Sequence, residues 1–319
     1  MIRYSEMVLP GHPDKFCDQA AEAIVEACHA IDDDAYCQVE MSVWCGKAFL
    51  TGGLCTREPL VKRPADIVRD MAKKIGYRAG DPNDPDALEI TSVICEEVGD
   101  PSRWTGHVND QCIATGWAGY DGKVDYLPPE HWLARRFHDA LVASCKSGAL
   151  EGCGPDGKLL VRLRESFDEW VIEHLLVTLQ HPEDVSIEQL TGAIDQVIGE
   201  CYERLQAGDK RWSGEWCDVE LLVNPNGPWH DGGSFDDNGQ TGRKLVMDYY
   251  GPRVPIGGGA IYGKHYQHID RVAARELREE AVRRVKEGER ECLVQGSWAP
   301  GMEKALDITQ AVNFGADSA

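Results

Sequence analysis

The sequence predicts an α+β protein in which helices cover one face of each sheet. Two observations support this class. Segments with helical periodicity alternate with pairs of strand-like segments along the chain, and the first of these pairs is joined by the turn-like Cys45-Gly46-Lys47. With 319 residues, the chain is long enough for two or three such units, each with its own core.

The first part of the chain predicts two helices and three strands. Apolar residues recur at helical spacing over residues 14–31, which indicates a helix with one buried face. Residues 36–44 and 48–54 are expected to be strands, because β-branched and aromatic residues alternate there with polar ones. Helical spacing returns over 64–77, and 88–96 is expected to be a strand.

The middle of the chain continues this alternation. Residues 112–117 are predicted to form a strand, and 128–147 an amphipathic helix whose large apolar side chains lie in register. Two strands are expected at 159–164 and 169–178, followed by a helix over 187–205.

The last third combines a strand at 219–223 with a glycine-rich connection over 224–263. A long charged helix is predicted at 269–286, and two strands at 291–298 and 304–312. No internal repeat is visible in the sequence, so the sequence pattern itself does not indicate that the units are related to one another.

The composition is that of a soluble globular protein, with 42% hydrophobic and 27% charged residues. The N-terminus has no basic start followed by an apolar run, and no segment is long and apolar enough for a membrane span, so we expect a cytoplasmic protein. The net charge of −21 argues against nucleic acid or an anionic membrane as a partner. Twelve scattered cysteines without a C-x-x-C pair indicate reduced thiols rather than disulfides or a zinc site.

The segment Gly11-His12-Pro13-Asp14-Lys15 combines an imidazole, a carboxylate and an ammonium group at an expected helix start. Proline is tolerated in a first helical turn, and the free N–H groups of that turn favour an anion. Asp14 is therefore a candidate for a divalent cation, Lys15 for phosphate, and His12 for a hydrogen bond to a leaving oxygen. The alternative is an ordinary capped helix at the surface.

Glycine-rich segments further along the chain carry more cations. Gly258 to Lys264 has the spacing of a phosphate-binding P-loop, but His265 stands where that motif needs Ser or Thr for magnesium. The preceding Gly251-Pro252 segment is not the buried strand that a P-loop requires, which excludes the P-loop fold. Glycines there still allow backbone N–H groups to approach phosphate closely.

Taken in order, these segments resemble the S-adenosylmethionine synthetase (methionine adenosyltransferase) family, from about residue 5 to about residue 298. The motifs that carry the resemblance are Gly11-His12-Pro13-Asp14-Lys15, Gly154-Pro155-Asp156-Gly157-Lys158, Asn224-Pro225-Asn226-Gly227, Gly239-Gln240-Thr241-Gly242-Arg243-Lys244, Gly257 to Lys264, and Asp270-Arg271.

The resemblance implies three similarly folded subdomains related by a pseudo-threefold axis, each a mixed sheet covered by helices. We expect subdomains at 1–105 and 106–215 and a truncated third one at 216–319, with exchange of segments between them. Compared with the family, the chain stops soon after Trp298, and the gating loop between Glu97 and Asn109 is shorter.

The resemblance also implies a reaction. Methionine sulfur attacks C5′ of ATP and expels triphosphate, which is then hydrolysed to phosphate and diphosphate. Such a reaction needs alignment of the reactants and cations that stabilise the leaving group. Two Mg²⁺ ions and K⁺ are the implied cofactors, and a homodimer with shared active sites, or a tetramer, is the implied assembly.

Matched motif by motif, the family assigns roles to residues of this chain. The implied ligands are Asp14 and Asp270 for magnesium and Glu40 for potassium. His12, Lys158, Lys264 and Arg243 are the implied catalytic residues, with His12 beside the departing oxygen. ATP would be bound by His12, Lys15, Asp156, Lys158, Trp229, Asp237, Arg243, Lys244 and Lys264, and the amino acid by Asp110, Asp237 and His268.

The departures from the family concern mainly the amino-acid substrate. Leu54 replaces a glutamate and His268 a lysine, both of which serve methionine in the family, and Glu97 stands where the family has a glutamine that contacts methionine. On the nucleotide side, Trp229 keeps an aromatic ring for adenine. Two alternatives therefore stay open: the same ATP chemistry on another thioether amino acid or as a phosphohydrolase, and a non-catalytic nucleotide-binding regulator.

Overall fold

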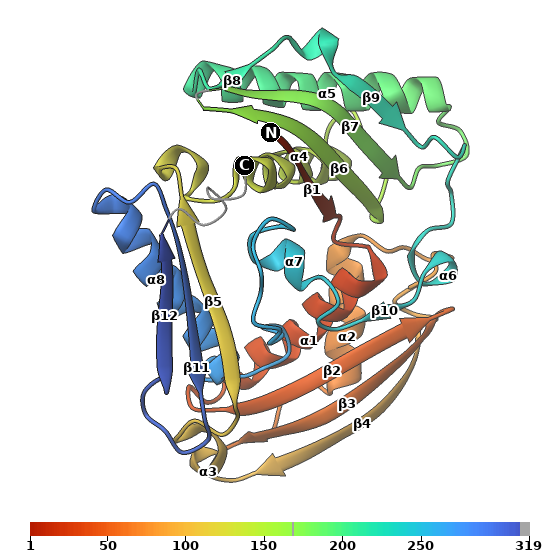
Figure 1. Cartoon of the computed structure of the whole chain (residues 1–319). Coiled ribbons are helices and arrows are strands. Elements are labelled where there is room, and N and C mark those ends of the chain that lie inside the picture. Colours follow the sequence, from red (N-terminus) through yellow and green to blue (C-terminus); the bar gives the residue numbers. More distant parts are fainter. Residues whose placement is uncertain (168, 313–319) are drawn as a thin grey trace.

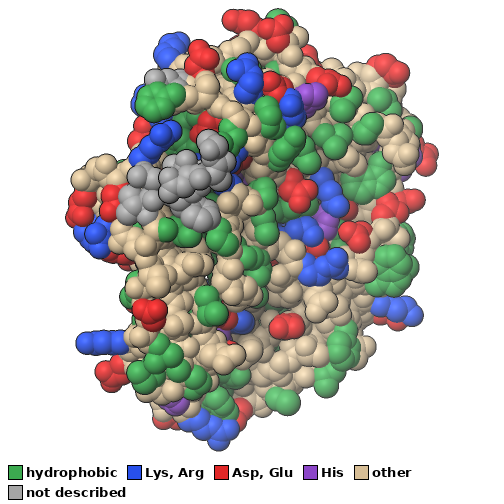
Figure 2. Space-filling view, viewed as in Figure 1, with side chains coloured by type: hydrophobic (Ala, Val, Ile, Leu, Met, Phe, Trp, Pro, Cys, Tyr) green, Lys and Arg blue, Asp and Glu red, His purple; other side chains and the backbone are tan. Residues whose placement is uncertain are grey.

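Three sheets surround a centre that holds helices and loops (Figure 1). The structure is a computed structural model, and it describes residues 1–167 and 169–312. Each sheet is packed against helices on one face, so the α+β class with covered sheets is confirmed. The same view in space-filling form shows acidic and basic side chains interspersed over this face (Figure 2).

Sheet A has five strands and mixed directions. β1 and β7 pair antiparallel with β6, while β8 and β9 pair parallel with β7. A core that includes Phe137, Leu175 and Ile194 joins the sheet to two helices. The strands are β1 (Ile2–Val8), β6 (Gly157–Ser166), β7 (Glu169–Leu179), β8 (Trp212–Ser213) and β9 (Glu220–Val223), and the helices are α4 (Pro129–Lys146) and α5 (Ile187–Gly208).

Sheet B has four strands and is covered by the two N-terminal helices. β2 pairs antiparallel with β3 and β10, and β3 pairs parallel with β4. The fully buried Phe16 and Ile24 of the first helix pack with Leu50 of β3. The strands are β2 (Tyr36–Trp44), β3 (Lys47–Thr56), β4 (Glu89–Val98) and β10 (Gly239–Gln240), and the helices are α1 (Pro13–His29) and α2 (Pro64–Ile75).

Sheet C is antiparallel throughout and has a single long helix on it. The buried side chains Ala273 and Leu277 of that helix pack against Val294. The strands are β5 (Cys112–Gly119), β11 (Glu291–Trp298) and β12 (Asp307–Val312), and the helix is α8 (Ile269–Lys286). Short helical turns complete the fold: α3 (Ser102–Thr105), η1 (Gly122–Val124), η2 (Trp216–Asp218), α6 (Gly233–Asp236) and α7 (Leu245–Asp248).

The five long helices expected from the sequence are present, and so are the eight main strands from 36–44 to 291–298, with ends that differ by a few residues. The expected strand at 304–312 begins later, at Asp307. Three kinds of element were not expected: strand β1, the two-residue strands β8 and β10, and the short helices. The glycine-rich segment 224–263 is not a plain connection, since it contains α6, β10 and α7.

Each sheet collects segments that are far apart in the sequence. β1 lies beside β6, β10 joins β2, and β5 pairs with β11. The boundaries near residues 105 and 215 and the pseudo-threefold relation stay predictions. The twelve cysteines are free thiols, and eight of them are buried. Among the described residues, no helix is long and apolar enough to cross a membrane.

Candidate active site

The site begins at the N-terminus of α1. His12 is the N-cap residue, and its Nδ1 accepts a hydrogen bond of 3.2 Å from the backbone N–H of Asp14, while Pro13 fills the first helical position. The loop before the helix lies directly against the second motif, because the N–H of Gly11 donates to the carbonyl of Pro155 at 3.0 Å. A Cβ at Gly11 would come within 2.6 Å of Pro155, so this approach requires glycine.

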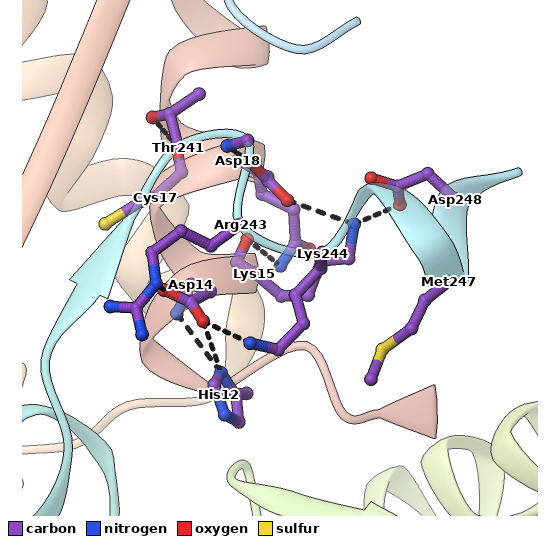
Figure 3. Close-up of polar contacts among 12 residues, drawn as sticks. His12, Asp14, Lys15, Cys17, Asp18, Thr241, Arg243, Lys244, Met247 and Asp248 are labelled. Carbon is purple, nitrogen blue, oxygen red and sulfur yellow. Dashed lines mark hydrogen bonds and ion pairs between the residues drawn. The ribbon is translucent and has the colours of Figure 1, made fainter. Parts of the chain in front are cut away.

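The motif at residues 239–244 packs on the same helix start. Asp14 is fully buried, and its Oδ1 accepts the N–H of Gln240 at 2.9 Å. Its Oδ2 is hydrogen-bonded to Lys244 Nζ, and Arg243 Nε lies 3.6 Å from Oδ1 (Figure 3). One buried carboxylate therefore holds two of the cations that the sequence predicts for phosphate.

His12 is a neutral hydrogen-bond donor in this surrounding. Burial, followed by the positive charges of Lys244 and Lys158, lowers the pKa of the His12 imidazole to about 3. Since Nδ1 accepts from a backbone N–H, the single ring proton belongs on Nε2. That nitrogen is buried and has no hydrogen-bond partner within the described residues, and Asp237 Oδ2 is 3.7 Å from it. The ring thus presents one unused donor between cations.

Asp156 contacts the loop that contains Trp229 and Gly233. Its Oδ2 accepts the N–H of Gly233 at 2.8 Å, and its Oδ1 is buried without a partner within residues 1–167 and 169–312. Burial raises the pKa of Asp156 to about 7, against the hydrogen bonds from Gly233 and Gly157. Lys158, the second residue of β6, is exposed, and Trp229 is half-buried.

Lys15 extends away from this group. Its Nζ is 3.0 Å from Asp18 Oδ2, contacts Asp248, and lies 4.5 Å above the centre of the Tyr262 ring (Figure 3). Burial alone would lower the pKa of Lys15, but the two carboxylates outweigh it and the pKa is raised. The structure therefore shows Lys15 in an ion-pair network of its own, on a different side of α1 from His12.

A second group forms at the N-terminus of α8 and repeats the first. His268 is the N-cap residue, and its Nδ1 accepts the N–H of Asp270 at 3.2 Å, the same bond that His12 makes with Asp14. Lys264 Nζ lies 2.6 Å from Asp270 Oδ2, as Lys244 pairs with Asp14. Burial, and then the charge of Lys264, lower the pKa of His268.

The two groups lie along one edge of β2. Gly239 pairs with Val43, whereas Lys264 forms a bridge with Gln38, five positions earlier on the strand. At ~3.4 Å per residue these points are about 17 Å apart. The structure thus brings His12, Asp14, Arg243 and Lys244 together, and separately Lys264, His268 and Asp270. Asp110 is exposed, and its negative charge partly opposes the lowering of the His268 pKa by burial and Lys264, so it belongs with the second group.

Glu40 lies on the exposed face of β2, beside a cavity of about 300 Å³ that Gln38, Thr51 and Gly53 also line. Two positions that depart from the family pattern, Leu54 and Glu97, lie on strands β3 and β4 of the same sheet. Leu54 is 4% exposed and packs in the core of sheet B, while Glu97 is exposed on β4 opposite Cys55.

Asp14 and Asp270 fit magnesium only in a site where other groups supply the remaining ligands. Asp14 and Asp270 each supply oxygen ligands, which Mg²⁺ prefers, but no group of three metal-ligating side chains exists in the part of the chain that the structure describes. Magnesium bound to proteins often has one or two carboxylates, with waters and substrate phosphates as the other ligands. The donor set therefore fits a metal held jointly with a polyphosphate.

Sequence reasoning missed the duplication of the helix start. The pattern His-x-Asp occurs at residues 12–14 and 268–270, each at the beginning of a predicted helix, and that shared spacing was the available signal. It also missed Asp18 and Asp248, which hold Lys15, because nothing in the spacing indicates which carboxylate a lysine contacts.

Comparison with known proteins identifies the family of this chain. The profile of the S-adenosylmethionine synthetase N-terminal domain matches residues 1–97, and that of the C-terminal domain matches residues 231–317. The S-adenosylmethionine synthase of Leifsonia xyli is 33% identical over 298 residues, covering 86% of this chain and 72% of the relative. The synthase of Thermus thermophilus is 32% identical over 327 residues, covering 95% and 80%. The chain therefore belongs to the S-adenosylmethionine synthetase family.

Proposed function

We propose that the protein is a methionine adenosyltransferase, which makes S-adenosylmethionine from ATP and L-methionine and releases phosphate and diphosphate. The observation that carries this proposal is the neutral, buried His12, whose unused Nε2–H lies among Lys244, Lys158 and Arg243. A donor surrounded by cations suits an oxygen that gains negative charge as it leaves carbon, because fixed dipoles and charges stabilise such a group without reorganisation.

The residues around His12 would divide the work. Lys158, Arg243 and Lys244 would hold the polyphosphate, and Asp156 with its loop would line the nucleotide pocket near Trp229. Asp237, half-exposed beside His12, would contact the ribose and the amino group of the amino acid. Magnesium on Asp14 and Asp270 would neutralise the phosphate oxygens, and Glu40 would bind potassium.

The separation of the two His-x-Asp groups supports a shared site. Lys264, His268, Asp270 and Asp110 lie apart from His12 within one chain. We propose a homodimer, or a tetramer made of two such dimers, in which the α1 group of one subunit faces the α8 group of its partner. Light scattering on the purified protein would test this, since a monomer that makes the product would contradict it. Cytoplasmic location is part of the same proposal.

Within this proposal, the identity of the amino-acid substrate is supported by the fewest observations. Leu54 is buried in the core of sheet B and offers no charge, and the neutral His268 stands for a lysine. These two side chains favour, as a second candidate, a thioether amino acid other than methionine.

The test is mass spectrometry of the purified protein incubated with ATP, methionine, magnesium and potassium, beside His12→Ala. As a matched control, His174→Ala removes a half-exposed histidine on β7, which pairs with Glu220. We expect S-adenosylmethionine with phosphate and diphosphate from the wild type and the control, and none from His12→Ala. Phosphate release without a sulfonium product would indicate another amino acid or a phosphohydrolase. ATP binding without turnover would indicate a regulatory relative.

A further inference from the structure

A second cavity adjoins the C-terminal end of α7, a helical turn that lies between the three sheets (Figure 1). Its volume is about 690 Å³, within the range of roughly 300–1,000 Å³ that small-molecule sites occupy. Residues of α1, α4, α8 and of the segment from Asp248 to Tyr266 line it. None of the side chains that line it has a role in the proposed reaction.

The cavity is rich in positive charge, although the protein as a whole carries −21. Five arginines line it: Arg135, Arg136, Arg271, Arg275 and Arg278. Two of the three acidic residues in the lining are neutralised, because Glu22 pairs with Arg271 and Asp248 pairs with Lys15. The third, Asp125, is exposed and accepts a hydrogen bond from Trp132.

Three of the arginines have no carboxylate partner within the described residues. Arg135 donates to the carbonyl of Asp248 at 2.9 Å, and Arg278 donates to the carbonyl of Tyr126 at 3.0 Å. Arg275 is exposed and makes no hydrogen bond or ion pair with the described part of the chain. Carbonyls fix the position of a guanidinium group but do not neutralise its charge.

Arg135 and Arg278 are half-buried, and this partial removal from water is unfavourable for their charges in the protein alone. Burial lowers the pKa of Arg135, and burial together with the charge of Arg135 lowers that of Arg278. A buried charge without a counter-ion is costly, so the cavity would be stabilised by an anion that brings negative charge to these side chains.

We propose that this cavity binds a small, multiply charged phosphate compound. The planar fork of arginine matches phosphate oxygens two at a time, and several guanidinium groups at one cavity favour a ligand with more than one negative charge. The ligand is either an inorganic polyphosphate or a nucleotide, which share this chemistry. The proposal does not depend on the reaction proposed above.

The experiment separates this cavity from the active site. Lys158→Ala with Arg243→Ala removes two cations of the proposed ATP site, and both side chains are exposed. In that background, we expect calorimetric titration with inorganic triphosphate to show one site per chain. The affinity should fall as salt is raised from about 50 mM to about 300 mM, because screening weakens the attraction.

Arg275→Glu is the test variant, since an exposed side chain without partners can be replaced with little effect on folding. We expect it to weaken binding at least about tenfold in the double-variant background. Arg275→Gln should give a smaller loss in the same direction. The matched control is Arg290→Glu, which makes the same charge change at another exposed arginine without an ion-pair partner in the described residues. The proposal is overturned by no binding in the background, by equal losses in Arg275→Glu and Arg290→Glu, or by no loss in Arg275→Glu.

Two further titrations identify the source of the ligand. Equal affinity for triphosphate and ADP would assign recognition to the phosphate chain, whereas tighter binding of ADP would add the nucleoside to the recognised group. Citrate carries similar charge without phosphorus, so citrate binding as tight as triphosphate binding would overturn the assignment to phosphate.

Discussion

Asp14→Asn tests whether the buried pair between Asp14 and Lys244 positions the active site. Asp14 is fully buried, and the side chain of Lys244 is 17% exposed. Asparagine keeps the acceptor for the N–H of Gln240 but leaves the lysine charge unpaired. Breaking a buried pair on one side costs about 3–5 kcal/mol, and the partial exposure of Lys244 puts the expected loss nearer about 2–3 kcal/mol. Lys244→Met should also destabilise, because it leaves the carboxylate with Arg243 alone.

The double variant Asp14→Asn, Lys244→Met removes both charges. Replacing a buried pair with uncharged side chains is often close to neutral, so the free energy of unfolding should return to within about 1 kcal/mol of the wild type. The coupling energy of the cycle, measured by urea unfolding, should exceed about 1.5 kcal/mol.

Product formation, followed by mass spectrometry, should be absent from Asp14→Asn and from the double variant alike, because neither offers a carboxylate for magnesium. Additive losses in the unfolding cycle would refute the argument that the two charges depend on each other. Recovery of turnover in the double variant would refute the role of Asp14.

Three further predictions concern pH, backbone and metal. Burial raises the pKa of Glu130 to about 7, so the folded protein retains a proton that the unfolded chain loses above about pH 4.5, and stability should fall as pH rises between these values. Glu130→Gln should flatten that dependence in melting curves recorded from pH 5 to pH 8, and an unchanged slope would contradict it. A Cβ at Gly263 would lie 2.0 Å from the carbonyl oxygen of Val39, so Gly263→Ala should displace Lys264 and reduce turnover by about 100-fold. Gly192→Ala on α5, where no atom lies within 4 Å of the added Cβ, should keep turnover near that of the wild type, and similar losses in both variants would refute the contact. Chelation of magnesium with EDTA should stop product formation without lowering the melting temperature, and a large drop in melting temperature would indicate a structural metal instead.

Periodicity predicted the long elements well, because burial on one face repeats at a fixed spacing over many residues. The helix over 269–286 has the expected bounds, and α1 begins and ends within two residues of them. β1 was not predicted, because one of its two buried side chains, Ser5, is polar and forms a hydrogen bond with His131. α7 has four residues, which is too short for any period to show.

The candidate site could be predicted only in part. The motifs identified His12, Asp14 and Lys244, whose contacts follow from short spacings at a helix start and a glycine turn. Their separation from Lys264 and Asp270 depends on where β2 brings each loop, and pairing between segments about 200 residues apart produces no pattern in the local sequence. The ion pairs of Lys15 are likewise a property of tertiary packing.

The two Lys–Asp pairs at the starts of α1 and α8 have a consequence for the order in which ligands arrive. Each aspartate is already engaged by a lysine, so a free divalent ion competes with an ammonium group for the same oxygen atoms. An incoming polyphosphate offers each lysine a new partner and releases the carboxylate at the same moment. With magnesium and ATP bound as proposed above, the metal and the polyphosphate would therefore enter together as one complex, and each lysine would exchange its carboxylate partner for a phosphate oxygen.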